Sequence, residues 1–268
     1  MISLLASGAR SPVGTRSQPM PVVADPGSRS ARQGPGWAQQ AWVTPQLLGA
    51  PVPMRAWRWR LGPLAASPAI RLGAPEGLLY LAAGSGTAEA GGRRFALAPE
   101  SVLWLPGCPR VVLRAGRAGL DALLALVPGR AAGPARAPRL FSAAELPHLV
   151  STRDSRDRLD LITESVPVAA ERIRAGRVTY QPGDTTAAHS HTACHHVFCV
   201  LAGAGLLCTE QQVCRLRAGM SGYVGPGEMH WLVNDTDAAF SFVEFWAPPP
   251  AGTVWAVPGD RSAWAPVS

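Results

Sequence analysis

The sequence contains no lysine, so its formal net charge of +7 rests entirely on arginine. Part of this excess lies in the first 33 residues, where four arginines accompany a single acidic residue, Asp25. The remaining arginines form no basic stripe with interleaved aromatic side chains, the pattern expected of a nucleic-acid-binding surface. The charge therefore does not predict a nucleic-acid partner.

Long apolar runs are also missing. No run reaches the ~18 residues that a membrane-spanning helix needs, so no membrane partner is expected. The opening segment MISLLASGAR has an apolar patch without a preceding basic segment, and we do not interpret it as a signal peptide. An odd cysteine count, five, favours reduced thiols and a cytoplasmic protein.

Long helical patterns are scarce, whereas glycine (28) and proline (26) are frequent. From Trp42 onward, short apolar runs alternate with Gly/Pro turns, for example in residues 77–84, 195–205 and 240–248. Runs of this length between turn signals are typical of antiparallel strands in a sandwich or barrel. The sequence therefore predicts an all-β protein.

The two halves of the chain repeat each other. Residues 78–86 (LLYLAAGSG) align with 197–205 (VFCVLAGAG), and 105–110 align with 225–230, at an offset of about 120 residues in both cases. Residues 1–33 have no apolar period and predict disorder, whereas the mixed charges of 151–174 predict a solvated linker with a helical turn. The predicted organisation is a disordered tail (1–38), a first β-domain (39–133), a linker (134–174), a second β-domain (175–248) and a C-terminal tail (249–268).

Five of the six histidines lie within residues 189–230. His189 and His191 are spaced i, i+2, which places both rings on one face of a strand. His196 would come from the next strand and His230 from a third. Three or four imidazoles on the inner face of a small barrel can bind one metal ion and leave positions for a substrate.

The spacing of these histidines resembles the two motifs of the cupin family, G-x5-H-x-H-x(3–4)-E-x6-G and G-x5-P-x-G-x2-H-x3-N. This chain reads Gly183-x5-His189-x-His191-x4-His196-x6-Gly203 and Gly219-x5-Gly225-x-Gly227-x2-His230-x3-Asn234. Two positions differ, since His196 replaces the usual glutamate and Gly225 replaces the first proline. The resemblance implies two cupin barrels (double-stranded β-helix, or jelly-roll, folds) in one chain.

The first copy lacks the ligands. Arg110 stands at the position of His230, and no H-x-H pair precedes Leu78. One active and one metal-free barrel is similar to the layout of ureidoglycine aminohydrolase-like bicupins, whose ligands are Glu, His, His and Gln. The resemblance implies a first barrel that acts as a structural partner or lid, and a second that binds the metal. The implied ligands are His189, His191, His196 and His230.

Four neutral imidazoles would not reduce the +2 charge of a divalent ion. A centre with this charge favours an anionic, chelating small-molecule substrate. Such sites suit Fe, Zn, Cu and Ni, with Mn less favoured. The leading hypothesis is therefore an Fe(II) dioxygenase. The alternatives are a non-redox hydrolase or lyase, and a non-catalytic cupin that binds a small ligand; cupins also often pair through sheet edges, so a homodimer is possible.

Three further side chains are candidates for proton transfer if they point into the barrel: Tyr180, Tyr223 and Glu244. The fourth metal ligand also has an alternative. His195 fits the shorter x3 spacing, whereas His196 fits x4 and is preferred, which leaves His195 as a residue at the rim.

Overall fold

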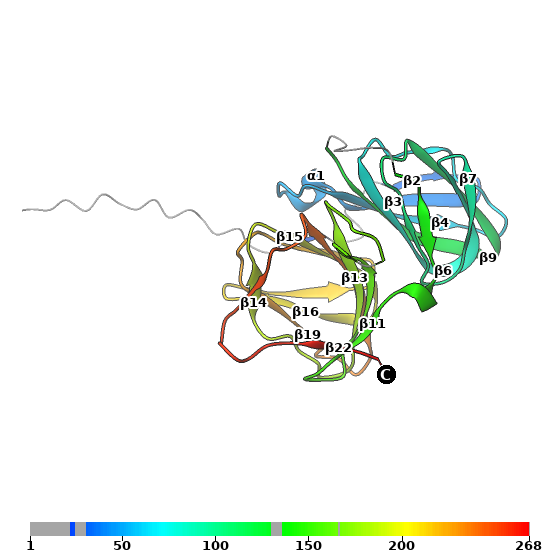
Figure 1. Ribbon diagram of the computed structural model, residues 1–268. Coiled ribbons are helices and arrows are strands. Elements are labelled where there is room, and N and C mark those ends of the chain that lie inside the picture. The colour runs from blue at the N-terminus through cyan, green and yellow to red at the C-terminus, as the bar shows by residue number, and fades with distance from the viewer. Residues whose placement is uncertain (1–21, 25–30, 130–135, 166, 268) are drawn as a thin grey trace, which may run out of the picture.

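The computed structural model describes residues 22–24, 31–129, 136–165 and 167–267, which form two β-barrels packed side by side (Figure 1). The predicted all-β class is confirmed. The elements of the first barrel are β2 (Ala31–Gly34), β3 (Trp37–Val43), α1 (Pro45–Leu48), β4 (Arg55–Leu61), β5 (Ile70–Arg71), β6 (Glu76–Ala90), β7 (Arg93–Leu97), β8 (Val102–Trp104), β9 (Arg110–Val127) and β10 (Arg139–Phe141).

One nine-stranded sheet wraps around the first barrel, in the order β10-β8-β6-β9-β4-β3-β2, with β5 on β9 and β7 on β6. Strands β6 and β9 are long enough to cross both walls, and they pair along their whole length. The pairing shifts register near Gly84, where φ is +81° and a side chain would collide with the carbonyl of Gly119. Glycine therefore allows the two long strands to bend together and close the barrel.

The second barrel consists of two sheets. The larger has eight strands in the order β1-β18-β15-β20-β13-β12-β11-β22, and the smaller has five in the order β17-β16-β19-β14-β21. The strands are β1 (Val22–Ala24), β11 (His148–Ser151), β12 (Asp157–Ile162), β13 (Arg174–Tyr180), β14 (His189–His191), β15 (His195–Ala202), β16 (Ala204–Thr209), β17 (Val213–Arg217), β18 (Ser221–Val224), β19 (His230–Val233), β20 (Phe240–Ala247), β21 (Thr253–Trp255) and β22 (Trp264–Pro266).

The two repeats exchange their first strands. Strand β1 precedes the first barrel in the chain but pairs with β18 of the second. Strand β10 precedes the second barrel but pairs with β8 of the first. Since β8 and β18 occupy equivalent places in the aligned repeats, the exchange is reciprocal, and it fits the predicted internal duplication.

Three apolar cores follow from the alternation of side chains along these strands. One fills the first barrel and includes Trp59, Leu81 and Leu103. Another fills part of the second barrel. The largest lies between the barrels, where Trp42 and Tyr80 of the first meet residues such as Phe245 of the second. Both large sheets are therefore buried on two faces, which joins the barrels into one packed body.

The structure corrects the predicted domain boundaries. Residues 22–24 and 31–38 are largely β-strand and do not belong to a disordered tail, whereas residues 1–21 and 25–30 lie outside the described residues. The predicted linker (134–174) contains β10, a short 3-10 helix (Ala143–Glu145), β11 and β12. The predicted C-terminal tail contains β21 and β22, both paired within the second barrel.

The linker prediction failed because charge was taken as a sign of exposure. Along β12, Arg158 and Asp160 alternate with Leu159 and Leu161, which is the period of a strand, and all four side chains are buried. The two charged residues form an ion pair inside the second barrel. The two leucines pack into the core between the barrels.

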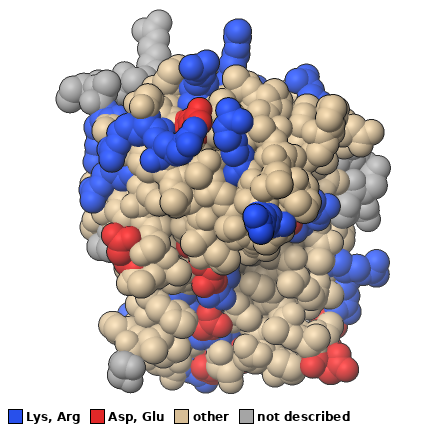
Figure 2. All heavy atoms as spheres, turned by 90° about the vertical axis from the view of Figure 1, so that its right-hand side faces the viewer, with Lys and Arg blue, Asp and Glu red and all other residues tan. Residues whose placement is uncertain are grey.

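The charged side chains on the face shown in Figure 2 stand in separate groups among large uncharged areas, and basic and acidic groups are mixed. On the first barrel, Glu89 forms ion pairs with Arg94 and Arg114. Among the described residues, no helix has the length and apolarity required to cross a membrane.

The core between the barrels predicts a large stability effect. Trp42 is fully buried there, so Trp42→Ala should lower the free energy of unfolding by about 3–5 kcal/mol. Urea denaturation followed by circular dichroism would measure the change. The control is Val213→Ala, because Val213 is exposed and its replacement should change stability by less than about 0.5 kcal/mol. A loss below about 1 kcal/mol for Trp42→Ala would contradict a packed interface between the barrels.

Candidate metal centre

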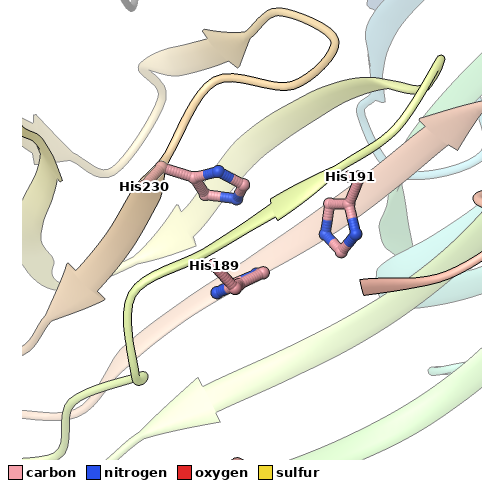
Figure 3. Close-up of side chains that lie close together, drawn as sticks. All are labelled: His189, His191 and His230. Carbon is pink, nitrogen blue, oxygen red and sulfur yellow. The ribbon is translucent and has the colours of Figure 1, made fainter. Parts of the chain in front are cut away.

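Two strands of the smaller sheet bring three histidines together in the second barrel. His189 and His191 lie on β14, and His230 begins β19, where it pairs directly with His189. One nitrogen of each ring lies within 4.8 Å of the others. Figure 3 shows the three rings pointing into the same space. The i, i+2 spacing on a strand therefore has the geometric result that the sequence predicted.

Hydrogen bonds to the backbone fix which ring nitrogen faces this space. Nδ1 of His189 lies 2.9 Å from the carbonyl oxygen of Ala187, and Nδ1 of His230 lies 2.9 Å from that of Glu228. A carbonyl can only accept, so Nδ1 of both rings carries the proton. The Nε2 atom of each ring therefore keeps its lone pair, which is the form that binds a metal.

His191 shows the strongest sign that a ligand belongs here. Its Nδ1 lies 3.4 Å from the hydroxyl of Thr253, whereas its Nε2 is buried without any hydrogen-bond partner. A buried, unpaired acceptor is costly unless something else satisfies it. A divalent ion held by His189, His191 and His230 fits this donor set.

Burial keeps the three rings neutral. Desolvation lowers the pKa of His191 to about 3, and the neighbouring His189 contributes to this shift. Desolvation also lowers the pKa of His189, and it lowers that of His230 well below its usual value. Protons therefore compete weakly with a metal for these nitrogens.

His196 lies beside the three histidines and links them to a carboxyl group. Its Nδ1 is 3.1 Å from Nε2 of His230, and its Nε2 is 3.2 Å from a carboxyl oxygen of Glu244. His196 is fully buried, and desolvation lowers its pKa well below the usual value. Whether it is a fourth ligand stays a prediction, because its Nδ1 faces His230 and not the shared centre.

Glu244 lies on β20, two residue pairs away from His196 along the paired strands β15 and β20. Burial raises the pKa of Glu244 to about 7, although Arg158 and Arg174 act in the opposite direction. A protonated Glu244 can donate to Nε2 of His196. A carboxyl group with a pKa near neutrality is suited to general acid–base catalysis.

A cavity of about 200 Å³ opens beside these residues. Its polar lining includes three arginines, Glu244 and three of the histidines, and its apolar lining includes three tryptophans. The lining residues are Arg156, Arg158, Arg174, Val178, Tyr180, Thr186, His189, His191, His196, Leu232, Glu244, Trp246, Pro250, Thr253, Trp255, Ser262 and Trp264. Two of the three predicted catalytic residues, Tyr180 and Glu244, therefore line the cavity.

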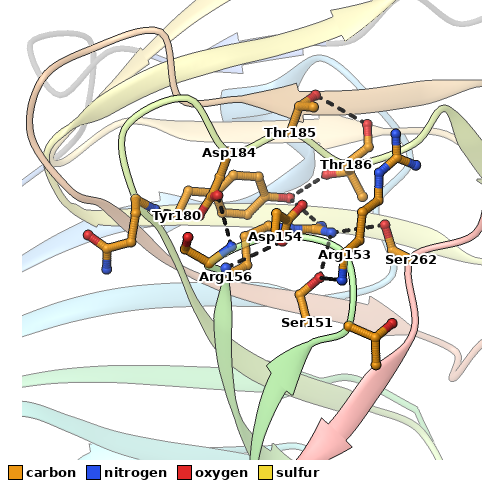
Figure 4. Close-up of polar contacts among 12 residues, drawn as sticks. Ser151, Arg153, Asp154, Arg156, Tyr180, Asp184, Thr185, Thr186 and Ser262 are labelled. Atoms are coloured by element: carbon orange, nitrogen blue, oxygen red, sulfur yellow. Dashed lines mark hydrogen bonds and ion pairs between the residues drawn. The ribbon is translucent and has the colours of Figure 1, made fainter.

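Tyr180 belongs to a polar network at one side of the cavity (Figure 4). Its hydroxyl contacts the Thr186 hydroxyl and lies 3.5 Å from a guanidinium nitrogen of Arg156. Arg156 is fully buried and also donates to Asp154 and to Ser262 of the C-terminal segment. Burial raises the pKa of Tyr180, so the group stays a phenol.

The prediction that Tyr223 points into the barrel is wrong. Tyr223 packs in the core between the barrels, and its hydroxyl lies 2.8 Å from Nδ1 of His195. Successive residues of a strand face opposite sides, so His196 points inward and His195 points outward with Tyr223. His195 is thus on the opposite side of the sheet from the three clustered histidines, which removes the case for it as a ligand.

Sequence reasoning missed the arginines and the C-terminal segment that line the cavity. One available signal was the alternation of Arg158 and Asp160 with leucines, which indicates a strand. For the C-terminal segment, no local signal indicated that Trp255 would pack on His189, with ring centroids 5.2 Å apart. Contacts of this kind depend on the path of the whole chain.

Comparison with known proteins agrees with this architecture. Residues 176–246 match the family model of the cupin domain. No curated protein matches the sequence. Solved structures of oxalate decarboxylase from Bacillus subtilis are similar in fold. A serine-to-alanine mutant has a TM-score of 0.72 and 15% identity over 88% of this chain and 79% of that chain. The structure at pH 4.6 has a TM-score of 0.71 and 16% identity over 88% and 78%. A structure described for its Mn(II) centres has a TM-score of 0.70 and 17% identity over 88% and 79%.

The second barrel is therefore a β-barrel of the cupin type that carries a cluster of three buried histidines. Residues 176–246 carry a cupin domain, and the whole chain has a two-barrel fold similar to that of the oxalate decarboxylase structures. At this level of identity the structural likeness establishes the fold, and the chemistry must be argued from the site.

The geometry of the site predicts which histidines are required for metal binding. His191→Ala and His230→Ala should each lower the metal affinity by more than the roughly 10- to 100-fold typical of losing a residue that only orients a ligand. Elemental analysis of the purified proteins would measure the occupancy. His148→Ala and His195→Ala are the controls, because His148 is exposed and His195 points away from the cluster. Wild-type occupancy in both His191→Ala and His230→Ala would place the metal elsewhere.

Proposed function

We propose that the second barrel is the active site of a mononuclear metal-dependent enzyme that acts on a small anionic metabolite by proton transfer, as a lyase or hydrolase does. The observation that carries the proposal is the unpaired, buried Nε2 of His191 beside a cavity lined by three arginines. The imidazoles account for the metal, and the guanidinium groups account for the negative charge of the substrate.

A divalent ion bound here would supply Lewis acidity and an anchoring point for a substrate oxygen. His189, His191 and His230 would hold it. The solved oxalate decarboxylase structures support a metal of this kind, since one is described for its Mn(II) centres. Fe(II), Mn, Ni, Zn and Cu all bind imidazole nitrogen, and which one this protein selects stays a prediction.

The chain's own residues provide the acid and the means to exclude water. Glu244 can hold a proton near neutral pH and exchange it with a substrate in the cavity, while His196 keeps its carboxyl group in place. Trp246 and Trp255 cover the histidines on two sides and limit access of solvent. Tyr180 is a second proton donor in the wall. This arrangement favours non-redox chemistry, of which decarboxylation and the ureidoglycine aminohydrolase type of reaction are examples.

Fe(II)-dependent dioxygenation is the second candidate function. It is favoured by the ligand set itself, because three neutral imidazoles without a carboxylate leave the charge of the ion uncompensated. The two functions differ in one requirement, which is molecular oxygen.

Substrate consumption with and without oxygen would separate the two candidates. Metal-loaded protein is mixed with a panel of two- to five-carbon carboxylic acids, and NMR follows the acids under air and under argon. Turnover that persists under argon, with no oxygen uptake, is the expected result. Turnover that stops under argon supports the dioxygenase, and a metal-loaded protein that consumes no member under either gas would count against both.

The role of Glu244 can be tested on the substrate found in this way. Glu244→Gln should lower kcat by about 10²–10⁴-fold, because the amide cannot take up or release the proton. Its metal content should stay at the wild-type value. Asp235→Asn, at an exposed ion pair with Arg215, is the control and should leave kcat unchanged. A Glu244→Gln enzyme with wild-type kcat would remove Glu244 from the mechanism.

A further inference from the structure

Two arginines lie on the same tryptophan beside the predicted metal ligands. The guanidinium carbons of Arg158 and Arg174 are each 5.3 Å from the centre of the Trp246 ring. Trp246 pairs with His196 on the neighbouring strand β15, and the two rings stack with their centroids 4.7 Å apart. His191 lies 6.0 Å from the same ring. The two positive charges are thus held a short distance from the histidines.

A glycine makes room for one of these arginines. Arg158 and Gly176 lie on the neighbouring strands β12 and β13, and a side-chain carbon at position 176 would lie only 3.1 Å from Nε of Arg158. The absence of a side chain therefore lets the guanidinium group lie over the backbone of β13 and reach Trp246. Gly176 lies on the same face of β13 as Val178, which lines the cavity, so a side chain at position 176 would also face the barrel interior.

The hydrogen-bonding capacity of this pair is not used up. Arg158 is buried and ion-paired with Asp160, yet its Nε is buried without a hydrogen-bond partner. Nε of Arg174 is likewise buried without a partner. Buried guanidinium nitrogens without acceptors are costly, and both arginines line the cavity. An acceptor that enters the cavity would satisfy them.

The cavity limits the size of such an acceptor. Its volume of about 200 Å³ lies below the roughly 300–1,000 Å³ that is typical of ligand pockets. A ligand that spans from the histidines to the arginines is therefore a small molecule. A planar carboxylate matches the forked geometry of a guanidinium group better than a point charge does.

We propose that Arg158 and Arg174, supported on Trp246, form an anion-binding subsite for the carboxylate at the metal-distal end of a short bifunctional acid. Such an acid has about two to five carbons, with a second oxygen donor at the end that faces the histidines. This inference rests on the proposed function, whose substrate class it narrows. It assigns Arg158 and Arg174 as specificity-determining residues.

The test compares malonate, which has two carboxylates, with propionate, which has one and is smaller. Calorimetric titration of the metal-loaded wild type should show malonate binding at least tenfold more tightly than propionate. In Arg174→Gln this preference should fall to about twofold or less, while the affinity for propionate and the metal content stay unchanged. Arg217→Gln, which removes an exposed arginine of β17, is the charge-matched control and should keep the full preference.

Gly176→Ala gives a second test that leaves both arginines in the chain. The added methyl group should displace the Arg158 side chain and reduce the preference for malonate at least threefold, and thermal denaturation would show that the variant is folded. A wild type without preference for malonate, or an Arg174→Gln variant that keeps it, overturns the subsite. Failure of the proposed function is seen separately. A wild type that holds no metal refutes the enzyme proposal. If malonate binding to that metal-free protein still depends on Arg174, the subsite is supported even though the enzyme proposal fails.

Discussion

Two short hydrogen bonds from ring nitrogens to backbone carbonyls control the candidate site. In both His189 and His230 the acceptor is the carbonyl oxygen two residues earlier, so the chain segment that positions each ring also sets its tautomer. The Nε2 atoms of both rings, which lie on the neighbouring strands β14 and β19, thereby face the same space before any ligand arrives. A site organised in advance in this way binds a metal without reordering its side chains. The low pKa values of the two rings come from burial, because both hydrogen bonds act in the opposite direction.

The two barrels share one architecture, but the first has an apolar, packed interior and the second contains a cavity. In the first barrel, leucine and tryptophan side chains pack the interior, and Arg110 stands at the position of His230. The carboxylate of Glu76 accepts hydrogen bonds from the indole N–H of Trp104 and from the backbone N–H of Arg172. In the second barrel the apolar core is smaller, and a cavity with a largely polar and aromatic lining lies next to it. Among the described residues, a cluster suited to a metal is found only in the second barrel.

The parts of this structure that the sequence predicted are those set by local spacing. The H-x-H pair of β14 needs only the period of a strand to place both rings on one face, and the duplication needs only the comparison of two segments. Predictions that depended on which face of a strand a single residue occupies were less secure. Tyr223 failed because a strand has two faces and nothing local showed that its outer face is buried against another barrel. Arg158 and Arg174 were missed because charged side chains are usually exposed to solvent. Here the pairing of β12 with β13 and of β13 with β20 places them in the second barrel, where they contact Asp160 and Trp246.

The C-terminal segment shows why the cavity is a property of the whole chain. Its strand β21 pairs with β14, so that Trp255 packs on His189 and Thr253 reaches Nδ1 of His191. Its second strand, β22, pairs with β11, and Trp264 lies against Arg156 and Arg158. Residues more than 60 positions from His189 and His191 in sequence thus complete both the metal side and the arginine side of the cavity. The histidine motif defines a centre, but much of the cavity beside this centre is built by residues on or next to β12, β13, β21 and β22, none of which carries the motif.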